Sequence, residues 1–228
     1  MKTNKDNLVV LYEDNHIIII NKRPGDIVQG DKTGDPPLSE IVKQYISEKY
    51  QKKGNVFLGV VHRLDRPTSG IVIFARTSKS LERLNKMLRD KQIKKTYWAI
   101  VKNKPAKVND TLIHYLKKNP KNNKSTVFSR ESEGCKKAVL HYKLIKELDN
   151  YYLLEIDLET GRHHQIRAQL SAINCAIKGD LKYGFNRSNP DGGISLHARE
   201  IQFIHPVSKE KIDITAQTPE SPIWNSCE

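Results

Sequence analysis

A charged stretch between two apolar segments constrains this chain more than any other feature. Residues 62–70 have the sequence HRLDRPTSG, and the apolar residues 56–61 (VFLGVV) and 71–75 (IVIFA) flank them. Short apolar runs bounded by Gly and Pro are typical of buried strands. We therefore expect a polar loop at the end of a core sheet, which is a common place for binding and catalytic residues.

Asp65 is the residue of this loop that can carry chemistry, because it lies between Arg63 and Arg66 with His62 nearby. Neighbouring cations favour the ionised form of a carboxylate at neutral pH. An ionised carboxylate on a loop can act as a base, a metal ligand or a covalent nucleophile. By residue type alone, a structural Asp that caps the turn and pairs with the arginines is the commoner explanation.

The stretch resembles the signature loop of the RluA family of RNA pseudouridine synthases, which is HRLD, two variable residues and TSG. Further segments resemble the other landmarks of the family and follow in the same order along the chain. They are residues 95–101 (KTYWAIV), 160–167 (TGRHHQIR), 179–184 (GDLKYG) and 195–206, which begin with SLHA and end with FIHP. The resemblance covers nearly the whole chain.

This resemblance implies the pseudouridine synthase fold and an isomerase that converts specific uridines of rRNA or tRNA to pseudouridine. It implies that Asp65 is the nucleophile, that Tyr97 lies against a flipped base, and that Arg167 pairs with Asp65. Without the resemblance, Tyr97 is an ordinary strand aromatic. The alternative from another class is a non-catalytic RNA-binding or RNA-folding protein on the same fold.

The resemblance also implies a set of substrate-binding residues from the same segments. Arg63 is expected to fill the gap left by the flipped nucleotide, and Ile166 and Leu196 to wall the base pocket. Arg162 is placed to meet phosphate near a helix N-terminus, although an exposed ion pair is as common for such an arginine. The full set is His62, Arg63, Arg66, Arg162, Gln165, Ile166 and Leu196.

The chain departs from the family at two places. His163 stands where the family often has Thr or Ser, and Ala168-Gln169-Leu170 replaces the commoner residues after HQIR. The match begins near Leu8, so we expect a single catalytic domain over residues 1–228. We expect it to lack the extra N-terminal RNA-binding domain of many relatives, and to be a monomer.

Composition limits the partners and cofactors. The chain has 39 Lys and Arg against 26 Asp and Glu, a net charge of +13. This excess suggests a polyanion such as RNA, although a generally basic soluble protein is the simpler alternative. No segment is long enough to span a membrane, and the first residues show no signal-peptide pattern, so we expect neither feature.

The cysteines and histidines predict no metal and no cofactor. The three cysteines are Cys135, Cys175 and Cys227, and their odd number and wide spacing fit neither disulfides nor zinc, which suggests the cytoplasm. His163 and His164 are adjacent, and adjacent residues do not share a helix face. No glycine-rich phosphate loop is present.

The hydrophobic pattern predicts an α+β fold with a large mixed, mostly antiparallel sheet flanked by helices. Apolar periodicity indicates helices over residues 38–50, 77–90 and 161–174. Alternation indicates antiparallel strands from residue 94 to 158. Further strands are expected at 9–13, 17–21, 194–205 and 211–216, and residues 117–124 (KKNPKNNK) are expected to form a mobile, basic tip.

Overall fold

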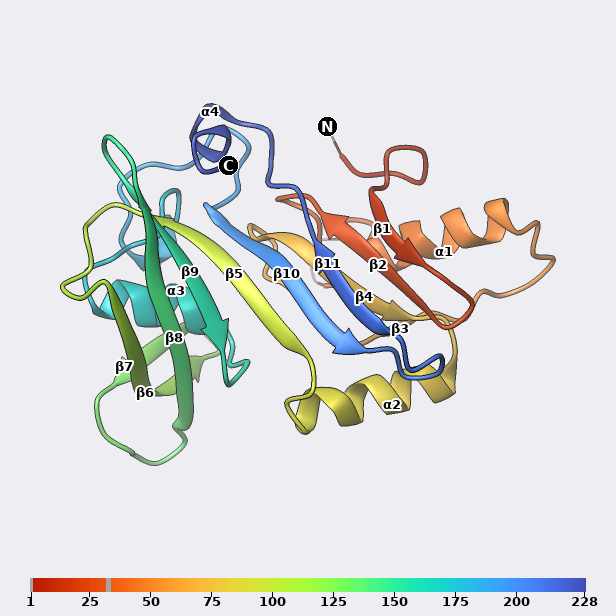
Figure 1. Cartoon of the computed structure of the whole chain (residues 1–228), viewed down its shortest axis with the longest axis horizontal. Helices are drawn as coiled ribbons and strands as arrows, with labels where there is room; N and C mark the ends of the chain where they lie inside the picture. The colour runs from red at the N-terminus through yellow and green to blue at the C-terminus, as the bar shows by residue number, and fades with distance from the viewer. Residues whose placement is uncertain (1, 32–33) are drawn as a thin grey trace. The chain divides into compact units, whose positions relative to one another are not determined.

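The computed structural model of the chain describes residues 2–31 and 34–228 (Figure 1). Its strands are β1 (Val10–Glu13), β2 (Ile17–Lys22), β3 (Gly59–Val60), β4 (Ser69–Ala75), β5 (Lys94–Val101), β6 (Asn109–Asn119), β7 (Lys124–Phe128), β8 (Lys136–Glu147), β9 (Tyr152–Leu158), β10 (Leu196–Ile204) and β11 (Lys211–Thr215). Its helices are α1 (Leu38–Lys49), α2 (Ser78–Arg89), α3 (Gln165–Ala172) and α4 (Pro222–Asn225), with a 3-10 turn η1 (Leu181–Tyr183). Helices and mostly antiparallel strands agree with the expected α+β class.

The chain forms two compact units, each with its own strands and core. Unit 1 consists of Met1–Lys94 and Ala198–Pro219, and unit 2 of Lys95–His197 and Glu220–Glu228. The expectation of a single catalytic domain stays a prediction, because compactness alone does not show whether a segment folds by itself.

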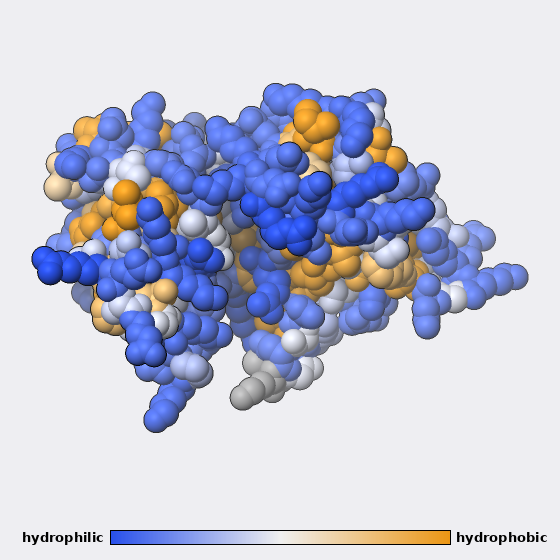
Figure 2. Space-filling view, turned by 90° about the horizontal axis from the view of Figure 1, so that it is seen from below, coloured by the Kyte–Doolittle hydropathy of each residue, from blue (hydrophilic) through white to orange (hydrophobic). Residues whose placement is uncertain are grey.

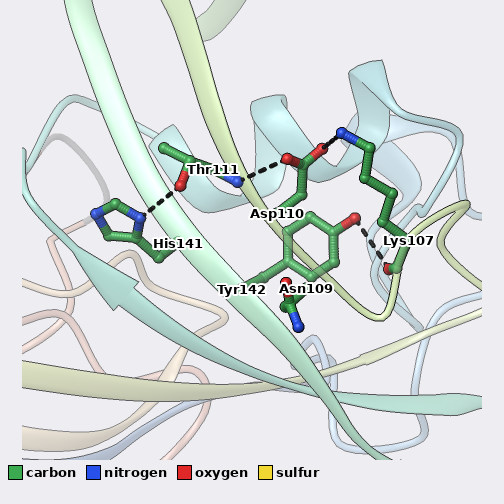
Figure 3. Close-up of a pocket in the computed structure, with 6 residues that line it drawn as sticks. All are labelled: Lys107, Asn109, Asp110, Thr111, His141 and Tyr142. Atoms are coloured by element: carbon green, nitrogen blue, oxygen red, sulfur yellow. Dashed lines mark hydrogen bonds and ion pairs between the residues drawn. The ribbon is translucent and has the colours of Figure 1, made fainter.

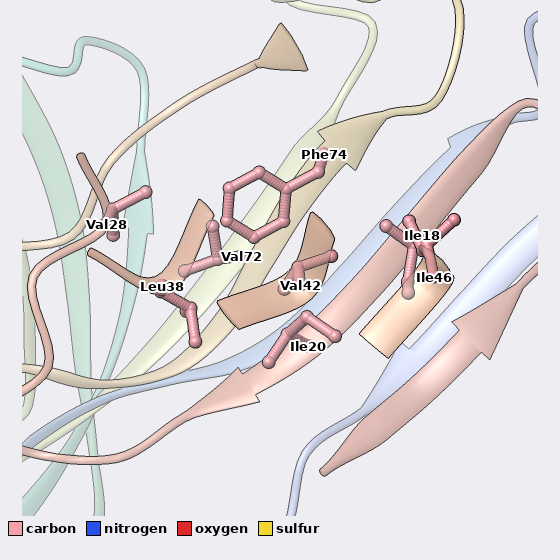
Figure 4. Packing of buried hydrophobic residues seen from close by; sticks show 8 residues of the cluster. All are labelled: Ile18, Ile20, Val28, Leu38, Val42, Ile46, Val72 and Phe74. Carbon is pink, nitrogen blue, oxygen red and sulfur yellow. The ribbon is translucent and has the colours of Figure 1, made fainter. Parts of the chain in front are cut away.

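Unit 1 is built around β2 and β4, which pair in antiparallel register. Four consecutive isoleucines of β2 and every residue of β4 are buried, as in strands covered on both faces. The apolar stripe of α1 contacts these strands. The cluster drawn in Figure 4 consists of Ile18, Ile20, Val28, Leu38, Val42, Ile46, Val72 and Phe74.

Both long helices of unit 1 begin and end close to the predicted residues. Thr77 caps α2, because its side-chain oxygen accepts a hydrogen bond from the Ser80 N–H at 3.1 Å. The apolar run at 56–61, in contrast, contributes only β3 to the sheet, so its predicted extent as a strand was wrong. Val56 and Leu58 still pack against the core cluster, which satisfies their hydrophobicity without a strand ladder.

Unit 2 contains the strand order β5-β9-β8-β6-β7, and each neighbouring pair is antiparallel. This confirms the prediction made from the alternating pattern between residues 94 and 158. The predicted loop at 117–124 was too long. β6 continues to Asn119 and β7 begins at Lys124, because Leu116 and Val127 pair across the hairpin and extend the ladder.

The helix predicted over residues 161–174 was also too long. It begins at Gln165, because His164 has a left-handed backbone with φ of 53°. A left-handed residue interrupts the helical hydrogen-bond ladder. Asn174, with φ of 60°, has the same effect beyond the C-terminal end.

The surface is rich in charge, as the composition requires. Figure 2 shows a face on which hydrophilic residues dominate and hydrophobic residues gather in patches between them. Within residues 2–31 and 34–228, no helix has the length and apolar character needed to cross a membrane.

Candidate active site

Asp65 lies in the loop between β3 and β4 of unit 1, and it is half-buried. One backbone hydrogen bond within the loop and one from another segment hold this loop in place. The Thr68 N–H donates to the Asp65 carbonyl at 3.0 Å, and the Gly25 N–H donates to the Arg66 carbonyl at 2.9 Å. The loop is therefore tied to a second segment, and its carboxylate is not sealed in the interior.

Lys22, the last residue of β2, lies under this loop with an exposed fraction of only 1%. Its Nζ donates to the carbonyl oxygens of Arg23 at 2.9 Å and Arg66 at 3.1 Å. Burial lowers the pKa of Lys22 to about 7, and the carboxylates of Asp26 and Asp65 act in the opposite direction. Sequence reasoning did not select Lys22, because its contact with Arg66 joins residues 44 positions apart.

Gly70 fixes the start of β4 directly after the loop. Its φ is +107°, and a Cβ at this position would lie 2.3 Å from the carbonyl oxygen of Ala198. Only glycine allows both the backbone conformation and this close approach. Thr68 and Ser69, which precede it, are buried.

The charged neighbours of Asp65 have different surroundings. Arg66 forms an ion pair with Asp35, and this contact holds the pKa of the Asp35 carboxyl below its usual value. His62 accepts a hydrogen bond at Nε2 from the Ile73 N–H at 3.2 Å. Arg63 is exposed. The loop thus carries two exposed arginines beside the half-buried Asp65, and of these Arg66 is paired with Asp35.

In unit 2, the predicted base-pocket residues are all buried. Tyr97 lies on β5 opposite Ile156 of β9. Ile166 belongs to α3 and Leu196 begins β10. Each of Tyr97, Ile166 and Leu196 is less than a tenth exposed.

Arg167 on α3 is held by Asp180 in a bidentate ion pair. Its Nε lies 2.7 Å from Oδ2 and its Nη2 lies 2.8 Å from Oδ1. Both residues are buried, and the guanidinium also lies over the Tyr183 ring, 5.1 Å from the centroid. This geometry orients the guanidinium firmly. The Arg167–Asp65 pair expected from the sequence joins residues of different units and stays a prediction.

No role was assigned to Asp180 from the sequence, so its contact with Arg167 was missed. The signal was its place in the GDLKYG segment. A buried arginine needs a buried acceptor, but that segment alone does not say that its aspartate lies beside Arg167.

The adjacent histidines stack on each other instead of sharing a ligand. Their ring centroids are 3.8 Å apart, and His164 Nδ1 lies 3.0 Å from the Tyr183 hydroxyl oxygen. Burial, together with the positive charge of Arg167, lowers the pKa of His164 to about 2, so its imidazole is neutral at pH 7. In the part of the chain that the structure describes, no group of three His, Cys, Asp or Glu residues is arranged to hold a metal ion.

Gln165 and Arg162 shape the turn before α3. The Gln165 Oε1 accepts from the Arg162 N–H at 2.9 Å and from the Thr160 hydroxyl at 2.8 Å, while its Nε2 donates to the Val139 carbonyl at 3.0 Å. Arg162 is exposed, and its Nε donates to the Lys137 carbonyl at 3.0 Å. The Gln165 amide therefore positions the turn, and its predicted contact with substrate stays a prediction.

A separate open pocket in unit 2 is drawn in Figure 3. It is lined by Lys107, Asn109, Asp110, Thr111, His141 and Tyr142. Lys107 pairs with Asp110 across it, at 3.2 Å. None of the predicted site residues lines this pocket.

Comparison with known proteins decides the family. The family model described as RNA pseudouridylate synthase matches residues 16–172, which include Asp65, Tyr97 and Arg167. This chain belongs to the RNA pseudouridylate synthase family. This confirms the family that the sequence motifs predicted.

Relatives of this synthase family are similar over most of the chain. An uncharacterized RNA pseudouridine synthase of Synechocystis sp. is 33% identical, over 93% of this chain and 66% of its own length. The ribosomal large subunit pseudouridine synthase D of Zymomonas mobilis is 31% identical, over 93% of this chain and 70% of its own length. The chain thus spans about two thirds of the length of these relatives.

The fold is also that of pseudouridylate synthase structures. Human RNA Pseudouridylate Synthase Domain Containing 4 matches with a TM-score of 0.78 and 22% identity, covering 95% of this chain and 90% of that protein. The predicted pseudouridine synthase fold is therefore confirmed.

Proposed function

We propose that this chain isomerises uridine to pseudouridine in RNA, with Asp65 as the nucleophile. One observation carries the proposal: in a chain of this family, Asp65 is half-buried on a loop that one internal backbone hydrogen bond and one from Gly25 hold in place. A nucleophile gains most when it is held in a reactive orientation before the substrate arrives.

The reaction needs no electrons from outside. The N1–C1′ bond of uridine breaks, the base rotates, a C5–C1′ bond forms, and C5 loses a proton while N1 gains one. Asp65 attacks either C1′ or the pyrimidine ring, and the resulting covalent intermediate keeps base and ribose in place. The carboxylate is then released, so that atoms and charge balance without a cofactor.

The other predicted residues supply binding and orientation. The target uridine must leave its stack, and a flipped base is held by stacking and hydrogen bonds. Tyr97 offers an aromatic ring for stacking, and Ile166 and Leu196 offer apolar walls. Arg167, oriented by Asp180, supplies a fixed positive charge for the Asp65 carboxylate.

The proposed substrate is the RNA of the large ribosomal subunit, with tRNA as the second choice. Relatives that carry the words ribosomal large subunit in their names support this order. The net charge of +13 suits a phosphate backbone. We further propose that the protein is a cytoplasmic monomer and that its activity requires neither a metal ion nor a membrane.

Replacement of the nucleophile tests this function. Large-subunit RNA from cells that lack the gene is incubated with wild type, Asp65→Ala, Asp65→Asn or the control Asp90→Asn, and pseudouridine is measured by mass spectrometry. We expect product from the wild type and the control and no detectable product from either Asp65 variant, because no other group replaces the nucleophile.

The folding of each variant is checked by circular dichroism. Equal product from the wild type and Asp65→Ala would remove Asp65 from the mechanism. No product from the wild type on any cellular RNA would favour the alternative, a non-catalytic RNA-binding protein.

A further inference from the structure

The hairpin of β6 and β7 has one covered face and one open face. Residues that pair directly across antiparallel strands point to the same side of the sheet. On one side, Leu116 pairs with Val127 of β7, and Leu116 packs with Ala168 of α3 and Tyr183 of η1. This side is closed by the core of unit 2.

The opposite side carries aromatic and apolar side chains, of which Ile113 and Phe128 are exposed and Tyr115 is half-buried. Tyr115 of β6 pairs with both Phe128 of β7 and Lys137 of β8, which makes a continuous row across three strands. Ile113 lies two residues before Tyr115, on the same side. Phe128 is 37% exposed and Ile113 is 53% exposed, and exposed residues of this kind gathered in one place indicate a binding surface.

Cations without carboxylate partners border this apolar row. Lys117, two residues after Tyr115, donates from Nζ to the Glu133 backbone carbonyl at 3.1 Å. Lys137 is exposed at the other end of the row. Elsewhere in unit 2, Lys104 and Lys107 pair with acids, whereas Lys117 and Lys137 pair with no carboxylate of the described residues. Both positive charges thus remain available for an anion.

We propose that this surface, formed by Ile113, Tyr115, Phe128, Lys117 and Lys137 and here called the hairpin face, binds a single-stranded segment of RNA. The aromatic rings stack on unpaired bases, and the two lysines contact the phosphates between them. Aromatic rings bordered by cations are the usual means of holding single strands, and stacking requires bases that are not paired in a duplex. The inference rests on the proposed function, because it assigns an additional contact to the same RNA substrate.

Direct binding of a short fluorescent oligouridylate tests the hairpin face without turnover. Tyr115→Ala/Phe128→Ala should weaken binding at least about 10-fold, because each lost base stack is worth about 5- to 150-fold. Lys117→Ala/Lys137→Ala should lower the slope of log affinity against log salt by about 1.4, since each cation on a single strand contributes about 0.7. Tyr115→Phe/Phe128→Tyr should bind like the wild type.

Matched controls remove the same kinds of group from other places in unit 2. Lys146→Ala removes an exposed cation from the far end of β8, and Val108→Ala trims an exposed apolar residue before β6. Both should bind like the wild type. A Phe128→Trp variant should show fluorescence quenching by oligouridylate beyond that of Trp98 and Trp224, which gives stacking a signal of its own. Melting curves by circular dichroism identify any variant that fails to fold. If a double variant does not fold, the fluorescence of the Phe128→Trp protein tests the proposal in its place.

Other outcomes overturn the inference. Unchanged affinity in both double variants, an equal loss in Lys146→Ala, or preference for duplex RNA over the single strand would each contradict it. Binding of the hairpin face to phosphatidylglycerol vesicles, without binding to oligouridylate, would also contradict it.

The proposed isomerase activity and the hairpin face can be tested independently of each other. If the wild type makes pseudouridine and the double variants keep its KM, the hairpin face is wrong and the activity stands. If the wild type binds oligouridylate through this face yet makes no pseudouridine, the activity is wrong and the face stands.

Discussion

At the scale of single residues, Lys22 is the group whose charge responds most directly to burial. Its pKa falls from about 10.5 in the unfolded chain to about 7 in the folded protein. Between these values the unfolded chain binds more protons, so this group makes the folded state more stable as the pH rises from about 7 towards 10. Below pH 7 both states hold the proton, and the full cost of burying the ammonium remains.

We therefore expect wild type to gain more free energy of unfolding than Lys22→Met between pH 7 and pH 9, measured by urea denaturation. Lys52→Met, at an exposed position, should gain as much as the wild type. Parallel curves for wild type and Lys22→Met would mean that the buried lysine keeps its proton throughout this range.

Gly70 gives a second prediction at this scale. Gly70→Ala should lower the free energy of unfolding by at least about 2 kcal/mol, because the new methyl group collides with the Ala198 backbone and φ is positive. Gly30→Ala, where nothing lies within 4 Å of the added Cβ, is the matched control and should change stability little. A urea titration of both variants measures the difference, and equal midpoints would contradict the strain.

At the scale of elements, the Arg167–Asp180 pair joins α3 to the segment that enters η1. Asp180→Asn should cost about 3 to 5 kcal/mol of folding free energy, since it leaves a buried guanidinium without its counter-charge. The exposed pair of Lys211 and Asp213 is the comparison, and Asp213→Asn should cost far less, because solvent screens an exposed ion pair. Chemical denaturation compares the two, and similar losses would show that burial of the first pair does not matter.

Elements were predictable where one strong pattern decides their position. The stripe of α1 and the Thr77 cap of α2 both follow local rules, and both helices were found within a residue or two. The start of α3 was missed because His164 is left-handed, which no residue type at that position requires. The length of the β6–β7 hairpin was missed because a polar sequence concealed the Leu116–Val127 pair.

The candidate site shows the same limit. Asp65 could be selected as a candidate because its motif is contiguous in sequence. The partners of Lys22 and Asp180 could not be predicted, because the Lys22–Arg66 hydrogen bond and the Arg167–Asp180 ion pair depend on tertiary structure. Buried charges must find partners, but the sequence does not say which partner is near.

At the scale of the whole molecule, the predicted catalytic residues come from both units. Asp65 belongs to unit 1, and Tyr97 and Arg167 belong to unit 2. The geometry within each unit supports its own part of the proposal: a tethered carboxylate in one, and a fixed guanidinium with a buried aromatic ring in the other. The Asp65 assay and the oligouridylate titration test these parts with different readouts.

Unit 1 is assembled from two segments that lie far apart in the sequence, Met1–Lys94 and Ala198–Pro219. Its later segment is bound into the earlier one, since the Asn21 side chain donates to the Gln217 carbonyl at 2.8 Å and Arg83 donates to the Pro206 carbonyl at 3.1 Å. A ribosome makes this later segment only after residues 95–197, so the nascent first segment waits without β10 and β11 while that stretch of unit 2 is translated. Unit 1 therefore cannot complete its fold as its first segment emerges, and the loop of Asp65 reaches its final surroundings only after Ala198, which packs against Gly70, has been made.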